Sequence, residues 1–353
     1  MSDSTSPILI ITGMHRSGTS LTASLLQSAG VDLGTDLIPA SEGNIKGHFE
    51  DLAVVQFHEN VLKAHDLPPE GWVNLQQIKT IPEPWLAKAQ AIISRKRETQ
   101  GVTGWKDPRG TLFLEFWESQ LPETKFLFLY RAPWEVVDSL YRRGDSIFVE
   151  SPELALEFWR TYNAAILEFY QRHPEKSLLL NVEAIRKDIA VLSGAIAQKF
   201  GLTLSLQPDI YDSSLFQSEV SQSPRSQLLQ TFFPDVVQQY QQLETQSDAA
   251  SAHCFQEDAT TQPLLDQQWF LRDWLEHRAT QRELAKVQQS EQELRTTLAE
   301  TTTALHQSQA QVAEQKEQII HLKDTIRGME SSKFWKMRQL WMRVKQRLPL
   351  ASN

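Results

Sequence analysis

Residues 13–20 read GMHRSGTS and follow the apolar run 7–12, a spacing that is typical of a loop that binds phosphate. Gly13 allows the chain a sharp exit from a strand, and Gly18 lets the backbone approach a ligand closely. The loop also contains three hydroxyl donors: Ser17, Thr19 and Ser20. A helix that opens behind such a loop directs its first N–H groups at the same point. The segment therefore predicts an anion site, with a generic anion-binding turn as the plainer alternative.

The loop lacks one residue that nucleoside triphosphatases require. Such enzymes place a lysine after the second glycine, where it contacts the β- and γ-phosphates, but this chain has Thr19 there. The cation lies inside the loop instead, at Arg16, with His15 beside it as a second candidate for ligand contact. The order Arg-Ser-Gly-Thr-Ser resembles the 5′-phosphosulfate loop of the sulfotransferases, in which Lys or Arg precedes Ser-Gly-Thr-Thr or a close relative. This resemblance implies that the loop binds the 5′ end of the donor and that Arg16 also acts in catalysis.

A second candidate site begins where the apolar run 125–130 ends, at Arg131. Pro133 can start a helix, which places Arg131 at the carboxyl end of a strand and Ser139 about two turns into the next helix. Both side chains can then reach one phosphate, although an arginine at a helix end and a surface serine would give the same sequence. The pair resembles the 3′-phosphate motif of the same family. The resemblance implies 3′-phosphoadenosine 5′-phosphosulfate (PAPS) as the donor substrate.

A third segment, Gly-Trp-Lys-Asp-Pro-Arg at 104–109, ends another predicted strand. Lys106 is therefore expected at the same edge of the sheet as the loop. The segment resembles the Lys-Asp-Pro segment of tyrosylprotein sulfotransferases, which implies that Lys106 contacts the sulfuryl centre and stabilises the charge that develops there. The alternative is structural, with Lys106 and Arg109 paired to Asp107 and nearby acids.

A base is needed if the acceptor is a hydroxyl, and the glycine-punctuated segment 43–51 offers three candidates. We select Glu50, because sulfotransferases that act on sugars and on tyrosine use a glutamate. The cytosolic small-molecule members use a histidine, which keeps His48 as an alternative, and Asp51 is the third. Glu50 and Asp51 have an equally plausible structural role as caps of the helix expected from about residue 53.

The order of the predicted strands and helices is typical of a parallel α/β sheet. Short apolar runs at 8–12, 102–105, 125–130 and 177–182 alternate with longer stretches of helical periodicity. We predict a parallel central sheet with helices on both faces, in the P-loop-like arrangement of the sulfotransferases, followed by a long coiled-coil helix. The predicted boundaries are a sulfotransferase domain at 1–245, a linker at 246–269, a coiled coil at 270–330 and a basic amphipathic tail at 331–353.

The coiled coil is predicted from an unbroken 3-4 spacing of seam positions between Leu284 and Met329. We expect it to join copies of the chain, although a lone solvated helix fits the same pattern. In the tail, one helical face is apolar and is surrounded by lysines and arginines: Phe334, Met337, Trp341, Val344 and Leu348. Such a face suits an anionic membrane interface, or equally another protein surface.

Composition limits the classes of function. The formal net charge of −9 argues against a protein that coats nucleic acid, and the single cysteine, Cys254, provides neither a disulfide nor a thiolate metal site. The first residues lack the basic region of a signal peptide, and no apolar run has the length of a membrane span. These features predict a cytoplasmic protein, with peripheral contact to the inner face of a membrane through the tail.

Together these patterns indicate a PAPS-dependent sulfotransferase that requires no metal. In this hypothesis an acceptor hydroxyl on a glycan, a lipid or another small molecule is deprotonated by Glu50 and attacks sulfur in line. Two alternatives stay open. A P-loop kinase would use ATP with Mg²⁺ and would not need Arg131, and a non-catalytic scaffold would bind nucleotide without turnover.

Overall fold

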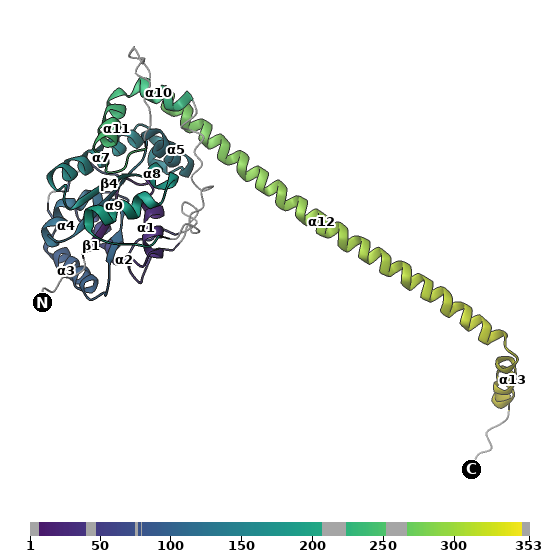
Figure 1. Cartoon of the computed structure of the whole chain (residues 1–353). Coiled ribbons are helices and arrows are strands. Elements are labelled where there is room, and N and C mark those ends of the chain that lie inside the picture. Colours follow the sequence, from purple (N-terminus) through teal and green to yellow (C-terminus); the bar gives the residue numbers. More distant parts are fainter. Residues whose placement is uncertain are drawn as a thin grey trace. The chain divides into compact units, whose positions relative to one another are not determined.

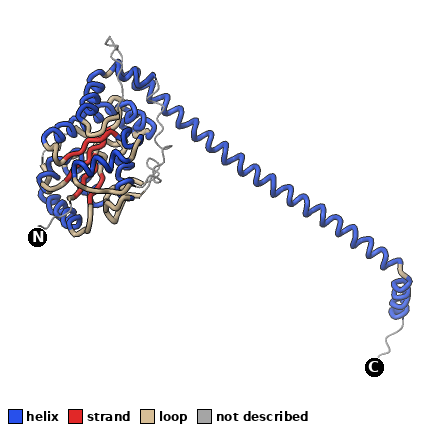
Figure 2. Tube along the Cα trace, viewed as in Figure 1, coloured by secondary structure: helices blue, strands red, loops and turns tan. Residues whose placement is uncertain are grey.

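The computed structural model describes residues 7–39, 47–74, 77–78, 80–206, 224–251 and 267–347 (Figure 1). The chain divides into two compact units, Met1–Thr280 and Gln281–Asn353. The first unit contains a sheet enclosed by helices (Figure 2), and the second is helical.

The sheet has four strands, β1 (Ile8–Thr12), β2 (Thr103–Lys106), β3 (Lys125–Tyr130) and β4 (Ser177–Asn181), in the order β2-β1-β3-β4. All three strand pairs are parallel. The strands are almost continuously apolar and buried, as expected for a parallel sheet covered on both faces. The predicted α/β class with a parallel central sheet is therefore confirmed. β2 lies one residue later than predicted, so that Lys106 is the last residue of the strand.

Alternate residues of the strands point into two separate cores, because successive side chains in a strand face opposite sides of the sheet. Ile8 and Ile10 belong to the larger core, and Leu9 and Ile11 to the smaller one. The smaller core is covered by α1 (Thr19–Ser28), α8 (Val182–Lys187) and α9 (Ala190–Phe200). The remaining elements of this unit that precede residue 247 are α2 (Leu52–Ala64), α3 (Glu83–Arg97), η2 (Pro108–Phe113), α4 (Leu114–Gln120), α5 (Pro133–Arg143), α6 (Ser146–Glu150), α7 (Leu154–Arg172), α10 (Pro224–Phe232) and α11 (Pro234–Gln246).

The segment after α11 returns to the sheet. The backbone N–H of Asn181 donates to the carbonyl of Ala249 at 2.9 Å, and the N–H of Asp248 donates to the carbonyl of Leu179 at 2.9 Å. The start of the predicted linker at 246–269 is thus held against β4, and residues 252–266 lie outside the described part of the chain. The next helix, α12 (Gln267–Ser331), begins in the first unit, where Trp274 is fully buried in the larger core.

In the second unit, α12 continues to Ser331 and is followed by α13 (Lys333–Arg347). The predicted helix is confirmed. The apolar side chains of its seam are exposed: Leu284, at one end of the seam, is 56% exposed and Met329, at the other end, is 58% exposed. Association of this seam with another chain stays a prediction. The described helices include none that is both long enough and apolar enough to cross a bilayer.

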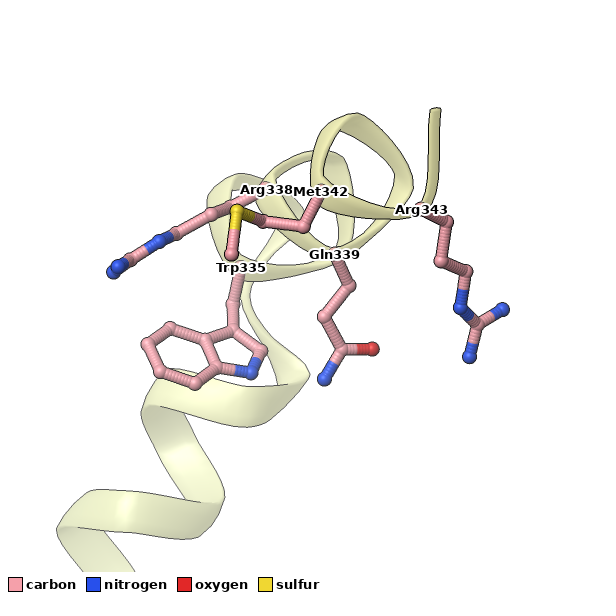
Figure 3. A pocket seen from close by; sticks show the side chains of 5 residues that line it. All are labelled: Trp335, Arg338, Gln339, Met342 and Arg343. Atoms are coloured by element: carbon pink, nitrogen blue, oxygen red, sulfur yellow. The ribbon is translucent and has the colours of Figure 1, made fainter. Parts of the chain in front are cut away.

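The face of α13 that sequence analysis assigned to a membrane or protein surface is also exposed, with Phe334 at 83% and Trp341 at 61%. Leu348, the last residue predicted for this face, lies outside the described residues. Figure 3 shows a shallow pocket on α13 that is lined by Trp335, Arg338, Gln339, Met342 and Arg343. All five come from one helix, so the pocket is part of its outer surface. Membrane contact by the tail stays a prediction.

A pair of glycine substitutions tests the packing of the sheet. A Cβ at Gly104 in β2 would lie 2.0 Å from the carbonyl oxygen of Leu9 in β1, whereas a Cβ at Gly194 in α9 would meet nothing within 4 Å. We expect Gly104→Ala to lower the free energy of unfolding by about 1–3 kcal/mol. Gly194→Ala, the control, should raise it by about 0.5–1 kcal/mol because alanine favours a helix. Urea unfolding followed by circular dichroism measures both, and an unchanged midpoint for Gly104→Ala would contradict the packing described.

Candidate active site

The loop between β1 and α1 is built around two glycines that no other residue can replace without rearrangement. Gly13 has φ +154°, and a Cβ there would lie 2.2 Å from the carbonyl oxygen of Leu129 in β3. Gly18, the N-cap of α1, has φ +88°, and a Cβ there would lie 2.1 Å from a methyl carbon of Val182. Both close approaches explain why the loop needs glycine at these positions.

Two further features of this loop bear on its role as a candidate anion site. Arg16 has φ +67°, an uncommon conformation for a residue with a side chain. Ser17 is fully buried, and its hydroxyl has no hydrogen-bond partner among the described residues. A buried hydroxyl without a partner is costly, so that an anion at the amino end of α1 would provide the missing acceptor.

The structure brings the loop 13–20 together with Arg131 and Ser139, the pair at and beyond the end of β3 that is called the strand-end motif below. Arg16 Nε donates to Ser139 Oγ at 2.8 Å, although the two residues are 123 positions apart. Arg131 also contacts the loop, because its Nη1 donates to the backbone oxygen of Arg16 at 3.4 Å. Arg131 also pairs with Glu135, whose carboxylate accepts from Arg131 Nε at 2.6 Å. Arg131 and Ser139 are both buried, with exposures of 5% and 3%.

Positive charge is concentrated around Arg16. Burial, followed by the neighbouring guanidinium groups of Arg143, Arg131 and Arg142, lowers the pKa of Arg16 to about 10, against an opposing effect of Asp145. An arginine whose protonated form is disfavoured by other arginines marks a place where an anion would be stabilised. The cluster lies where the loop and α5 meet.

Lys106 occupies the position that sequence analysis predicted. The register pairs it with Ile11, so that its side chain emerges beside the loop. Lys106 Nζ donates to Glu50 Oε1 at 2.6 Å, to Ser20 Oγ at 3.1 Å and to the backbone oxygen of His48 at 3.2 Å. Lys106 is 2% exposed. It therefore links the loop directly to the segment that holds the candidate bases.

The three candidate bases have different surroundings. Glu50 is buried, and its second carboxylate oxygen accepts from Arg109 at 3.1 Å. Asp51 is the N-cap of α2 and accepts from the N–H of Ala53 at 3.1 Å, as the capping alternative had anticipated. Its carboxylate also pairs with Arg95 at 2.6 Å and with Lys96 at 3.1 Å, both of α3.

His48 meets Lys106 through its backbone oxygen. Burial lowers the pKa of the His48 imidazole, partly opposed by Glu50, so that the ring is neutral near pH 7. Glu50 is the only one of the three whose carboxylate or ring is hydrogen-bonded to Lys106 among the interactions of the described residues.

His15 lies in the loop but turns toward an aromatic group. Its Nε2 donates to the carbonyl of Glu70 at 3.1 Å, and its ring centroid is 4.5 Å from that of Trp72. Burial, followed by the charge of Arg143, holds the pKa of His15 well below its usual value. A neutral His15 next to Trp72 thus forms a wall beside the loop.

Sequence analysis missed a buried network behind Lys106. His58 Nδ1 donates to Asp107 at 2.8 Å, and its Nε2 accepts from Trp117 Nε1 at 2.8 Å, which defines a neutral imidazole. Asp107 also accepts from Arg109 Nε at 2.9 Å. This arrangement fixes Arg109, and through it Glu50. The pairing with nearby acids that was weighed as the structural alternative for Lys106 and Arg109 is present for both, since Lys106 pairs with Glu50 and Arg109 with Asp107 and Glu50. His58 lies among apolar residues of α2. Its hydrogen bond to Asp107, 49 positions away, is what distinguishes it from an ordinary core residue.

Metal ligands are not grouped in this site. Among the residues that the structure describes, no cluster of three or more His, Cys, Asp or Glu side chains is arranged to hold a metal ion.

Comparison with protein families and with curated proteins finds no match for this chain. Among solved structures, it is similar to the sulfotransferase domain of the Synechococcus PCC 7002 olefin synthase, with 20% identity, a TM-score of 0.39, and coverage of 68% of this chain and 96% of that one. A sulfotransferase domain from the curacin biosynthetic pathway has 14% identity and a TM-score of 0.38 over 61% of this chain and 79% of that one. The sulfotransferase STF1 of Mycobacterium tuberculosis H37Rv has 14% identity and a TM-score of 0.34 over 57% of this chain and 68% of that one. Since these values are low, the proposals below depend on the residues of the site.

The unpartnered hydroxyl of Ser17 gives a test of the anion site. We expect Ser17→Ala to leave the free energy of unfolding unchanged or slightly higher, because a buried unsatisfied group is removed. Its affinity for 3′,5′-adenosine bisphosphate should fall about tenfold, as one hydrogen bond to a charged group is lost. Ser24→Ala is the matched control, since Ser24 Oγ donates to the carbonyl of Leu21 within α1. Equal affinities of both variants in calorimetry would mean that Ser17 does not face the ligand.

Proposed function

We propose that this chain is a PAPS-dependent sulfotransferase that moves a sulfuryl group to an acceptor hydroxyl. The observation that carries the proposal is the hydrogen bond between Arg16 and Ser139, with Arg131 against the same loop. It supports one ligand with two separated phosphate groups, because the loop and the strand-end motif each suit an anion and lie side by side.

The donor fits the residues on both sides of this contact. Its 5′-phosphosulfate would lie on the loop 13–20, where the N-cap Gly18 offers no side-chain cap to α1 and where the Ser17 hydroxyl has no partner among the described residues. Its 3′-phosphate would lie against Arg131 and Ser139. The Arg16–Ser139 hydrogen bond supports this arrangement because a phosphate between the two side chains would accept from both.

The chemistry follows from the charges around the loop. In the proposed reaction the acceptor oxygen forms a bond to sulfur while the bond from sulfur to the bridging phosphate oxygen breaks, and its electron pair leaves with 3′,5′-adenosine bisphosphate. Arg16 and Lys106 stabilise the negative charge on the transferring and leaving groups. Glu50 takes the proton of the acceptor hydroxyl.

The contacts of Glu50 suggest the order of these events. Lys106 and Arg109 now hold its two carboxylate oxygens at 2.6 Å and 3.1 Å. An anionic donor beside Ser20 would compete for Lys106 and release one oxygen of Glu50 toward the acceptor. Donor binding would therefore prepare the base, and the acceptor would react only after the donor is in place.

The acceptor side of the site is aromatic. Trp72 stacks on Phe158 with ring centroids 5.6 Å apart, meets Phe148 edge-on at 5.0 Å, and contacts His15. The Arg143 guanidinium lies 5.8 Å from the Trp72 ring centroid. This wall suits a sugar ring, a phenol or the headgroup of a lipid.

We further propose that copies of the chain associate through the apolar seam of α12. Burial of a stripe as long as that between Leu284 and Met329 stabilises a coiled coil, while the polar seam residues Glu291, Thr301 and Ser308 limit its strength. The proposed partner of this seam is a second copy of the chain, because its α12 has the same 3-4 spacing of apolar residues.

Calorimetry of three nucleotides without Mg²⁺ tests the donor assignment. Wild-type protein should bind 3′,5′-adenosine bisphosphate at least about tenfold more tightly than 5′-AMP, because Arg131 and Ser139 add charge-assisted hydrogen bonds. Arg131→Ala should lose this preference. The strongest binding to ATP, or an unchanged preference in Arg131→Ala, would contradict the proposal and favour a kinase.

Glu50→Gln is the control in the same experiment. Because Glu50 contacts Lys106 and not the strand-end motif, this variant should keep the preference for the bisphosphate. Once an acceptor is found, it should lose sulfuryl transfer. Donor binding by wild type with no transfer to any glycan, phenol or lipid hydroxyl would favour a non-catalytic scaffold.

The association of α12 is tested by sedimentation equilibrium. We expect the wild-type chain to exceed the mass of a monomer at micromolar concentration and Leu298→Lys with Leu305→Lys to be monomeric, because like charges would meet in the seam. Thr296→Lys with Thr303→Lys adds the same charge two positions outside the seam and should leave the assembly intact. A monomeric wild type would rule out the proposed association.

A further inference from the structure

A buried carboxylate precedes Ser139 on α5. Asp138 is 1% exposed, and its two oxygens accept three hydrogen bonds. Arg142 Nε donates to Oδ2 at 3.1 Å from one turn further along α5. The other two donors come from the first turns of α12: Trp274 Nε1 at 3.1 Å and Arg278 Nε at 2.6 Å, both to Oδ1.

These first turns of α12 pack as part of the core. Trp274 is fully buried and meets Tyr141 of α5 edge-on, with ring centroids 5.9 Å apart. One turn earlier, Phe270 stacks on Phe232 of α10 at 5.2 Å. Burial of these aromatic side chains fixes the helix against α5 and determines which of its polar groups reach Asp138.

The contacts of Trp274 and Arg278 with Asp138 affect α5 next to Ser139, which contacts the loop 13–20. Asp138 and Ser139 are adjacent, and Ser139 Oγ accepts from Arg16. Any change in the orientation of α5 at Asp138 therefore moves the hydroxyl that is proposed to bind the 3′-phosphate. Arg278 also supplies a positive charge to Asp138, which a buried carboxylate requires.

The negative charge of Asp138 has a second cationic partner, Arg142 of α5. Burial lowers the pKa of Arg142; Asp138 opposes this effect, and Arg278 and then Arg131 reinforce it. Asp138 thus lies between two cations, one on α5 and one on α12, and the four charged groups belong to one electrostatic cluster. Loss of Arg278 would leave Asp138 with one cationic partner among the described residues, Arg142, and with the neutral indole of Trp274.

We propose that the first turns of α12, through Trp274 and Arg278, complete the 3′-phosphate site by holding Asp138 and with it Ser139. The two residues are positioning residues, since their hydrogen bonds within the described part of the chain go to Asp138 and not to the loop 13–20. This inference rests on the proposed function. It assigns to the first turns of α12 a part in the selection of a 3′-phosphorylated donor.

The test measures the affinities of full-length Trp274→Phe and Arg278→Ala for 3′,5′-adenosine bisphosphate and for 5′-AMP. Both variants should bind the bisphosphate about tenfold more weakly and AMP as wild type does, as expected for one lost hydrogen bond to a charged group. Arg278→Lys keeps the charge and should recover part of the preference. Arg272→Ala, an exposed arginine of the same helical segment, is the matched control and should behave as wild type.

The possible outcomes separate the inference from the function on which it depends. An unchanged ratio of the two affinities in Trp274→Phe and Arg278→Ala would overturn the inference and leave the proposed function intact. Equal weakening of both ligands together with a lower melting temperature would show a merely structural role and also overturn it. A wild-type protein that does not prefer the bisphosphate would contradict the proposed function itself.

Discussion

The close approach of the β1–α1 loop to the carbonyl of Leu129 is the constraint on which the rest of the site depends. A side chain at Gly13 would collide with that oxygen at 2.2 Å, and one at Gly18 would collide with Val182 at 2.1 Å. Only with both glycines can the loop lie across the ends of β3 and β4, where Arg131 and α5 follow. The contact of Arg16 with Ser139 is a consequence of this approach.

Charge compensation organises the buried surroundings of the loop. Arg131 pairs with Glu135, Lys106 with Glu50, and Arg109 with both Asp107 and Glu50. Buried ion pairs of this kind contribute little net stability, because desolvation offsets much of their attraction. Their arrangement is better explained by the orientation they impose, since each pair fixes a cation or a carboxylate at the edge of the sheet where the strands end.

Local patterns predicted where much of this candidate site lies in the fold. The two glycines, Arg16 and the hydroxyl residues belong to one short segment, and the apolar runs before Lys106 and Arg131 located both at the carboxyl ends of strands. In a parallel sheet these ends lie at one edge, so their proximity followed from the fold class. The α/β sheet itself was predictable because each strand is a short buried run of apolar residues.

The contacts that sequence analysis did not predict join residues that are far apart. His58 reaches Asp107 over 49 positions, and Asp138 reaches Arg278 over 140. Nothing in the surroundings of His58 on α2 distinguishes it from an apolar core residue until Asp107 and Trp117 are placed beside it. The two roles considered for Glu50 and Asp51 were likewise separated only by geometry, since Asp51 caps α2 and Glu50 meets Lys106.

The crystal structure of the chain with 3′,5′-adenosine bisphosphate would test the central claim most directly. We expect the 5′-phosphate on the loop 13–20 within hydrogen-bond distance of Ser17 Oγ, and the 3′-phosphate in contact with Arg131 and Ser139. A 3′-phosphate directed into solvent, or a nucleotide bound away from the loop, would contradict it.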